Sequence, residues 1–378
     1  MRVLAHRAAI VGVGLIGGSL GMRWRAGGQV GRVVGFGRSP DHLRRAIELG
    51  AIDEAAPDLA AAVGGADLVV LGAPVQACIA MAPEIARLAA AGAVLTDVAS
   101  TKGAIGLAMA RALRQRRPTD DGGAAPPTFV GGHPMAGAER AGVEAADPYL
   151  FENAVWVLCP GPEVPPPALE RLVGLVEATG AHPAVMDAAR HDRRVAAISH
   201  LPQLAAVALA EAAGAGEAED PGLLALAGGG FRDTTRIAQS PADMWLDVLE
   251  TNRGPILEQI DRFQAALGDL RGAVERADAA AVRRHFEAAA AARRQVPARQ
   301  KGLLPNYHDL VLVVPDRPGV IGALCGALGA REVNVQDIEI LRLREGEGGT
   351  LRLGFRTAPE AAAALEVLTA LGYRVQRR

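Results

Sequence analysis

A glycine-rich turn near the amino end constrains the fold of this chain more than any other feature. The run from Gly12 to Gly17 follows an apolar, strand-like stretch at Ala8–Val11 and opens a helix-compatible segment. In that context the glycine spacing is typical of a strand–turn–helix unit that binds a dinucleotide, the alternative being a plain turn in a glycine-rich chain. Free N–H groups at the helix start favour phosphate binding. The expected cofactor contacts are Gly12, Gly14, Leu15, Ile16 and Gly17.

Length and composition indicate a globular protein without a nucleic-acid or membrane partner. At 378 residues, half of them hydrophobic and 22% charged, the chain has material for about two or three domains. A net charge of −2 gives no reason to expect nucleic acid, and no unbroken apolar stretch reaches the roughly 20 residues of a membrane span. The three cysteines, Cys78, Cys159 and Cys325, lie far apart, which predicts no metal site and no disulfide framework and fits a reducing cytoplasm.

The hydrophobic pattern divides the chain into three parts. Residues 1–160 alternate short strands with helices, which predicts an α/β Rossmann-like domain with a mostly parallel sheet covered on both faces. Residues 161–300 lose the strands, so we expect an all-helical substrate-binding domain that pairs with a second copy as a homodimer. Residues 306–378 restart as βαββαβ, the ferredoxin-like arrangement. The stretches 116–127 and 296–306 are interpreted as a surface loop and a linker.

The tip of the second expected strand, Val30–Phe36, bears on the choice of cofactor. An NAD-preferring site usually has Asp or Glu about 20 residues past the glycine turn, to bind the ribose 2′-hydroxyl. This chain has Arg38 and Ser39 there, a cation and a hydroxyl suited to a 2′-phosphate. We therefore expect NADP to be preferred over NAD, unless Arg38 is solvated and stacks on the adenine of either cofactor. Another strand end should bring a loop to the same edge: Ala73, Pro74 and Val75.

Two strand ends carry candidate catalytic side chains. His133 follows the apolar pair Phe129–Val130, and its flanking glycines allow a ligand to approach closely. A histidine at this edge of a nucleotide-binding fold is a candidate acid or base, with a structural role in the loop as the alternative. Ser100 follows another strand and is a candidate donor to substrate or cofactor, with helix capping as its alternative.

The helical part contains a polar stripe with a kink. Asp192, Ser199 and Gln203 fall on one face of a helix that also carries His200. Pro202 should break the local hydrogen-bond ladder and kink this helix. Because the surrounding residues are apolar, we interpret the stripe as a cavity wall.

A glycine loop at 228–230 leads into a short helix with two arginines. Arg232 and Arg236 lie one turn apart, and a guanidinium is a natural anchor for a carboxylate. Met244 and Trp245 follow on the next helix, where core packing is the more common role for such residues.

Taken together, these segments resemble the prephenate/arogenate dehydrogenase family of tyrosine biosynthesis. The matches occur in family order over residues 8–252: GVGLIGGSL, LGAPV, TDVASTKG, FVGGHPMAG, HDRRVAAISHLP and GGGFRDTTRIAQSPADMW. The resemblance implies that prephenate gives a hydride to nicotinamide, loses CO2 and becomes 4-hydroxyphenylpyruvate. It implies that His133 accepts the hydrogen bond and then the proton of the ring hydroxyl, that Ser100 supports this hydroxyl, and that Arg236 anchors a substrate carboxylate. The other implied substrate-site residues are His200, Gln203, Asp192, Gly229 and Trp245.

A neutral histidine as acceptor predicts activity that rises with pH around about 6.5, before environmental shifts. One position departs from many prephenate-specific members of the family, which carry histidine where this chain has Gln203. An amide both donates and accepts, which suits the ammonium and carboxylate of arogenate, so arogenate or dual specificity remains open.

The tail resembles an ACT domain, through Asp316-Arg317-Pro318-Gly319-Val320 and the later Asn334. Paired modules of this kind bind amino acids at their interface, which implies tyrosine as a feedback inhibitor. The allosteric residues implied are Asp316, Pro318, Gly319, Val320 and Asn334. A module that has kept only a dimerising role is the alternative.

Two other classes of protein are alternatives to this interpretation. A β-hydroxyacid dehydrogenase would rely on a catalytic lysine in the helical domain, yet the only lysines, Lys102 and Lys301, lie outside its expected helices. A non-catalytic amino-acid sensor would produce no reduced nicotinamide when prephenate is added.

Overall fold

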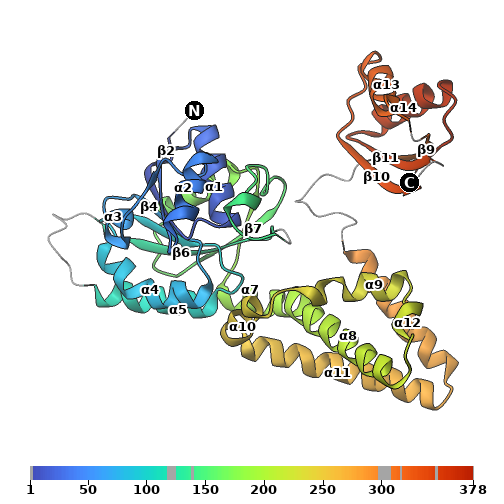
Figure 1. Cartoon of the computed structure of the whole chain (residues 1–378), viewed down its shortest axis with the longest axis horizontal. Coiled ribbons are helices and arrows are strands. Elements are labelled where there is room, and N and C mark those ends of the chain that lie inside the picture. The colour runs from blue at the N-terminus through green and yellow to red at the C-terminus, as the bar shows by residue number, and fades with distance from the viewer. Residues whose placement is uncertain are drawn as a thin grey trace. The chain divides into compact units, whose positions relative to one another are not determined.

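The structure is a computed structural model, and it describes residues 3–116, 125–137, 140–296, 308–315, 317–344 and 348–377. The chain divides into two compact units, Met1–Gly302 and Leu303–Arg378 (Figure 1). Most of the loop expected at 116–127, the linker expected at 296–306, and Asp316 lie outside the described residues.

The first unit contains a mixed sheet of eight strands in the order β3-β2-β1-β4-β5-β6-β7-β8. Every neighbouring pair is parallel except β6 and β7, which confirms the prediction of a mostly parallel sheet. The strands are β1 (Ala5–Val11), β2 (Val30–Phe36), β3 (Glu54–Ala55), β4 (Leu68–Leu71), β5 (Val94–Asp97), β6 (Thr128–Pro134), β7 (Val155–Pro160) and β8 (His182–Val185).

Helices cover both faces of this sheet. One core cluster joins the sheet to α1 (Leu15–Gly27), α2 (Pro40–Glu48) and α6 (Pro166–Glu177). The other joins it to α3 (Leu59–Val63), α4 (Val75–Leu88) and α5 (Gly103–Gln115). With both faces covered, a central strand such as β4 is buried along its whole length and reads as an unbroken apolar run.

The expectation that strands end near residue 160 is wrong. Helix α6 packs on the sheet through Leu172, Leu175 and Val176, and β8 adds a further parallel strand beside β7. The four-residue strand β8 contains His and Pro and is only partly buried, so it lacks the apolar run by which the other strands are found. We therefore place the start of the helical part after residue 185.

The helical part begins with two helices that are joined by a π-helical turn. Between α7 (Ala188–Val195) and α8 (Leu201–Glu219) the chain forms one π-helical turn, η2 (Ala196–His200). Pro202 lies in the first turn of α8, where it has no N–H to give to the preceding ladder. The predicted break in the regular hydrogen-bond ladder is present as this π-helical turn. The remaining elements are η3 (Leu224–Leu226), α9 (Gly229–Thr235), η4 (Arg236–Gln239), α10 (Ala242–Thr251), α11 (Arg253–Glu275) and α12 (Ala279–Gln295).

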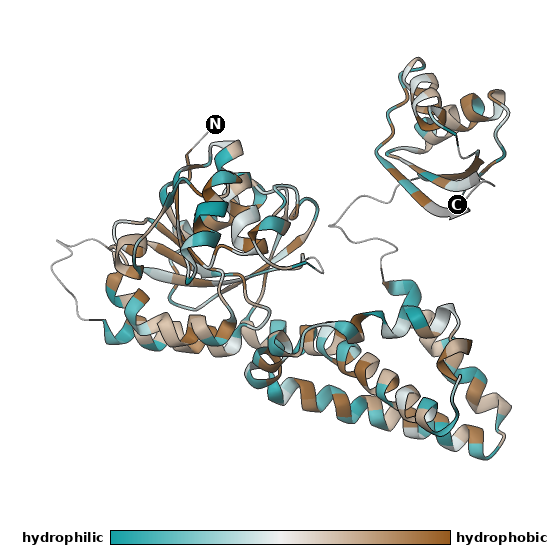
Figure 2. Ribbon diagram, viewed as in Figure 1, coloured by the Kyte–Doolittle hydropathy of each residue, from teal (hydrophilic) through white to brown (hydrophobic). Residues whose placement is uncertain are grey.

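This helical part leaves many apolar side chains exposed. Figure 2 shows hydrophobic residues along α8 and α11, and Leu257, Phe263 and Leu267 of α11 are among the exposed large hydrophobics. Among the described residues, the continuous helix Ala188–Glu219 is long and apolar enough to cross a membrane by length and composition alone. That is weak evidence for a span, because the same helix carries buried polar side chains, His191, Asp192 and His200.

The second unit has the predicted βαββαβ order. Its antiparallel sheet has the strand order β10-β11-β9-β12, with one core formed between sheet and helices. The elements are β9 (His308–Val314), α13 (Val320–Gly329), β10 (Asp337–Arg344), β11 (Gly348–Phe355), α14 (Ala358–Ala370) and β12 (Val375–Arg377).

Candidate active site

The carboxyl ends of four parallel strands bring the predicted site residues to one edge of the sheet. Because β1, β4, β5 and β6 run in the same direction, their carboxyl ends share this edge. The glycine turn follows β1, Ala73 and Pro74 follow β4, Ser100 follows β5, and His133 lies near the end of β6.

The glycine turn has the shape that a dinucleotide requires. Gly12 has φ +102°, and a Cβ there would lie 2.5 Å from the backbone nitrogen of Ala73. A Cβ at Gly17 would lie 2.4 Å from the carbonyl oxygen of Gly12. A Cβ at Gly14 would meet nothing within 4 Å, so the bare backbone there faces open space at the start of α1, where no side chain caps the helix. A pyrophosphate fits this position, with Leu15 and Ile16 in the first turn.

The neighbouring loops supply the other predicted cofactor residues. Arg38 is exposed beyond the end of β2, and the hydroxyl of Ser39 accepts a hydrogen bond from the backbone N–H of His42 at 3.3 Å, which caps α2. Pro74 caps α4, and Val75 is buried in its first turn. These positions suit the adenosine side of a dinucleotide.

A cavity of about 270 Å³ opens between the sheet edge and the helical part. Its polar lining consists of Ser100, His133, Ser199 and His200, with the indole of Trp245 beside them. The apolar lining includes Pro134, Met135, Ala136, Met244 and Val248. The structure therefore brings Ser100, His133, His200 and Trp245 together as predicted.

The surroundings of His133 favour its neutral form. Burial lowers the pKa of its imidazole well below 6.5, and the positive charge of Lys102 lowers it further, with smaller contributions from His191 and His200. The rise of activity with pH should therefore occur below the value expected for an unperturbed histidine.

A buried ion pair lies beneath the carboxyl ends of β5 and β6. Lys102 pairs with Asp97, and both side chains are fully buried. The Lys102 ammonium also donates to the carbonyl of Gly132 at 2.6 Å, and the Asp97 carboxylate accepts from the backbone N–H groups of Ala99 at 2.8 Å and Gly132 at 3.2 Å. This pair therefore fixes the backbone next to Ser100 and His133 at once.

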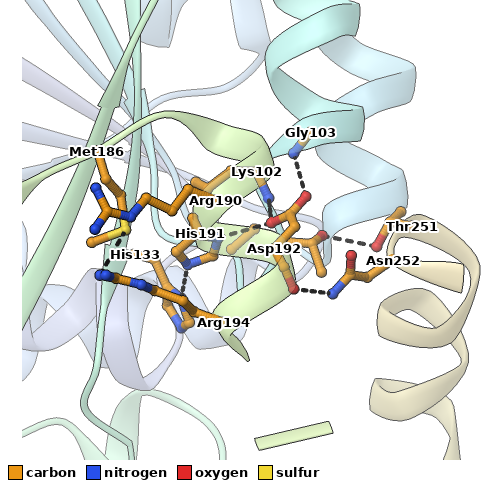
Figure 3. Close-up of polar contacts among 12 residues, drawn as sticks. Lys102, Gly103, His133, Met186, Arg190, His191, Asp192, Arg194, Thr251 and Asn252 are labelled. Carbon is orange, nitrogen blue, oxygen red and sulfur yellow. Dashed lines mark hydrogen bonds and ion pairs between the residues drawn. The ribbon is translucent and has the colours of Figure 1, made fainter. Parts of the chain in front are cut away.

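A second network reaches His133 from α7 (Figure 3). Nδ1 of His133 lies 2.8 Å from Nε2 of His191, and Nδ1 of His191 lies 2.8 Å from Oδ1 of Asp192. The Asp192 carboxylate accepts the backbone N–H groups of Lys102 and Gly103, each at 2.8 Å, and so caps the amino end of α5. Asp192 is thus buried behind the cavity and does not line it.

His200 is held by Asn252 and lies edge-on to Trp245. The amide nitrogen of Asn252 lies 3.1 Å from Nδ1 of His200 and also donates to the carbonyl of Asp192 at 2.9 Å. The two rings are T-shaped, 5.9 Å between centroids. Burial lowers the pKa of His200 to about 4. The indole N–H of Trp245 has no hydrogen-bond partner within the described part of the chain.

Like Asp192, three further predicted substrate residues do not line the cavity. Gln203 is buried and donates to the carbonyl of Ile237 at 2.8 Å, next to Arg236. Arg236 on η4 and Gly229 on α9 are exposed in this single chain.

The predicted allosteric residues lie in the second unit. Pro318 and Asn334 are exposed, and Gly319 caps α13 with φ +85°. Among the described residues, no cluster of three or more His, Cys, Asp or Glu side chains could hold a metal ion.

Sequence reasoning missed Lys102, His191 and Asn252 as site residues. Lys102 bears on the sequence argument only as a lysine outside the helical domain, and Asn252 carries no local pattern. His191 stands directly before Asp192 in a matching segment, which was the one available signal.

A doubly wound sheet with a dinucleotide turn, and a histidine-lined cavity at the same edge, define a nicotinamide-dependent dehydrogenase. The family model for the nucleotide-binding domain of prephenate dehydrogenase matches residues 20–185, the model for its dimerization domain matches 187–288, and the ACT domain model matches 308–371. The chain belongs to the prephenate dehydrogenase family.

Relatives of known name match most of the chain. A prephenate dehydrogenase from Bacillus subtilis is 35% identical over 98% of this chain and 97% of its own length. The crystal structure of prephenate dehydrogenase from Aquifex aeolicus in complex with hydroxyphenyl propionate and NAD+ is 29% identical, with a TM-score of 0.69, over 77% of this chain and 98% of that one. Synechocystis arogenate dehydrogenase is 28% identical, with a TM-score of 0.67, over 77% of this chain and 100% of that one.

Proposed function

We propose that this chain oxidatively decarboxylates prephenate to 4-hydroxyphenylpyruvate with a nicotinamide cofactor. The observation that carries the proposal is the placement of His133 and Ser100 in one cavity at the sheet edge that bears the dinucleotide turn. Family membership supports the same reaction.

A nicotinamide bound at the glycine turn would supply the acceptor for the hydride of the hydroxyl-bearing ring carbon. His133, kept neutral by burial and by Lys102, accepts the hydrogen bond of the ring hydroxyl and holds its proton as the carbon is oxidised. Ser100 supports the same oxygen. Loss of CO2 then makes the ring aromatic, and the oxygen takes its proton back.

The substrate carboxylates need donors at the other side of the cavity. His200 is available there, as is the indole N–H of Trp245, which has no hydrogen-bond partner among the described residues. Arg236 is the proposed carboxylate anchor, and Gln203 holds the adjoining residue Ile237 in place. Asp192 acts on the pocket from behind, and Gly229 is proposed to approach the substrate.

The test is His133→Asn with prephenate and either cofactor. The variant should lose about 100-fold or more in kcat with a modest change in KM, because general acid–base catalysis contributes that much. Turnover near wild type would remove His133 from the mechanism. If the wild-type protein produces no reduced nicotinamide when prephenate is added, the alternative of a non-catalytic sensor is favoured.

Arogenate is the second candidate substrate. The specific observation is Gln203, whose neutral amide stands where many prephenate-specific relatives carry histidine. If Gln203 sets this preference, Gln203→His should raise kcat/KM for prephenate relative to kcat/KM for arogenate by about tenfold. That factor corresponds roughly to one hydrogen bond to a charged group. An unchanged ratio would exclude Gln203 as the determinant.

NADP is the proposed preferred cofactor. Arg38 is exposed beyond β2, and no acidic residue stands at this strand tip. Ser39 retains its hydroxyl hydrogen as a donor while its oxygen caps α2.

A homodimer regulated by tyrosine is the proposed assembly, located in the cytoplasm. The exposed apolar side chains of α11 and the dimerization-domain match support pairing. In the second unit, Gly319 follows the carboxyl end of β9, whereas Asn334 precedes Asp337, which lies level with Asp309 at the other end of β9. This separation within one chain supports a tyrosine site whose two halves come from two copies. Pro318, Val320 and Asp316 complete the proposed site.

Calorimetry with tyrosine on the full chain and on residues 1–300 tests this regulation. Heat of binding should appear with the full chain only. Binding to neither chain would leave the ACT domain a dimerising role, and a stable monomer in sedimentation at micromolar concentration would contradict the dimer.

A further inference from the structure

His191 is a buried histidine that the proposed reaction does not use directly. It is 1% exposed, and it lies between the side chain of His133 and the carboxylate of Asp192 (Figure 3). The two imidazole rings meet edge-on, with centroids 5.0 Å apart and planes at 76°. In such a buried chain of hydrogen bonds, each group donates to one neighbour and accepts from the other. A group that can only accept, or only donate, therefore sets the direction of all the hydrogen bonds in the chain.

Asp192 sets that direction. Its two oxygens already accept the N–H groups of Lys102 and Gly103 at the positive end of α5, which favours the ionised, acceptor-only carboxylate. Nδ1 of His191 must therefore carry the hydrogen that is donated to Asp192. With His191 taken as a neutral imidazole, which has only one N–H, Nε2 of His191 is an acceptor and Nδ1 of His133 is the donor facing it.

We propose that His191, oriented by Asp192, is a positioning residue that holds His133 in the tautomer with hydrogen on Nδ1 and a bare lone pair on Nε2. The proposal rests on the proposed function, because Nε2 is then the atom that accepts the ring hydroxyl. The O–H bond breaks as the N–H bond forms at Nε2, while the ring carbon gives its hydride to the nicotinamide. The proton returns to the same oxygen when CO2 leaves, so no proton is gained or lost.

The same chain of contacts stabilises the charged form of His133. When Nε2 takes the proton, Nδ1–H continues to donate to His191, whose own N–H points to the Asp192 carboxylate. Lys102 and His200 are further titratable groups that act on His133. Lys102 opposes the charge on His133, and Asp192 offsets it through His191.

The experiment measures the tautomer directly, without substrate or cofactor. The full chain is labelled with 15N-histidine, and the two ring nitrogens of His133 are identified by their loss in His133→Asn. We expect hydrogen on Nδ1 and none on Nε2 in the wild type. In His191→Phe, which removes the acceptor and keeps a ring, His133 should change to the Nε2–H form that isolated imidazole favours. A wild type with hydrogen on Nε2, or the same tautomer in His191→Phe, would overturn the proposal.

A second variant separates positioning from packing. Gln in place of His191 retains an oxygen that can accept from His133, so His191→Gln should keep more of the wild-type tautomer and more of kcat than His191→Phe. His191→Phe should lose at least about tenfold in kcat with KM little changed, a part of what proton transfer contributes. His182→Phe, on β8 away from the cavity, is the matched control and should leave kcat unchanged. If His191→Phe and His191→Gln lost kcat equally and the tautomer of His133 stayed unchanged, the role of His191 would be purely structural.

The two proposals fail differently. If the tautomer shifts in His191→Phe while His133→Asn retains turnover, the reaction proposed above is wrong and the control of the tautomer by His191 stands.

Discussion

The ammonium group of Lys102 forms a fully buried ion pair with the carboxylate of Asp97, directly below Gly132 and His133. Burial raises the pKa of the Asp97 carboxyl, and Lys102 opposes that rise. Replacing Lys102 by Met should therefore lower the free energy of unfolding by about 3–5 kcal/mol, because a buried charge loses its partner. Urea unfolding measures this. The double variant Lys102→Met/Asp97→Asn should recover part of the loss, and a single variant as stable as the wild type would contradict the account.

The glycine turn separates a cofactor effect from a folding effect. Gly14→Ala should fold with an unchanged melting temperature, since a Cβ there meets nothing within 4 Å, yet bind the cofactor at least about tenfold more weakly because the backbone approaches the pyrophosphate at this point. Gly17→Ala is the matched comparison. Its Cβ would lie 2.4 Å from the Gly12 carbonyl oxygen, so it should lose stability first. Thermal melting and fluorescence titration of the cofactor give both readouts, and normal cofactor affinity in Gly14→Ala would reject the turn as the binding site.

Acid should destabilise the first unit through His200. Its pKa is lowered from 6.5 to about 4, so the unfolded chain binds this proton more tightly than the folded one. The stabilisation is complete above pH 6.5 and is lost as the pH falls toward 4, by roughly 3 kcal/mol. His133, whose pKa is also lowered, acts in the same direction.

His200→Gln should therefore unfold with less dependence on pH between 7 and 4.5 than the wild type. His42→Gln, at an exposed position on α2, is the control and should follow the wild type. If the free energy of unfolding depended on pH equally in the wild type and in His200→Gln, His200 would not be buried in its neutral form.

Cofactor preference should depend on the exposed guanidinium beyond β2. Arg38→Ala is expected to lower kcat/KM for NADP by about tenfold or more and to change the value for NAD much less, because a charged hydrogen bond to the 2′-phosphate is removed. Arg44→Ala, exposed on α2, should alter neither value. An equal loss with both cofactors would indicate that Arg38 only stacks on the adenine.

Much of the fold was predictable because its signals are local. The glycine turn, the strand–helix alternation and the βαββαβ tail each depend on residues close together in the sequence, and the structure has all three. The break in the α-helical ladder before Pro202 was predictable for the same reason, since it follows from one missing N–H. Strand β8 was not, because its short, partly buried segment has no periodic pattern.

The amino-acid sequence by itself determined which strand ends carry Ser100 and His133, and therefore the edge of the sheet at which chemistry takes place. Only the tertiary structure decided what surrounds them. His191 lies 58 residues from His133 and Asp192 lies 90 residues from Lys102 along the chain, so their contacts exist only once α7 packs against the sheet edge. The physical reason is range: backbone propensity and hydrophobic periodicity act over a few residues, whereas the protonation and orientation of a buried side chain depend on whichever groups the fold brings against it.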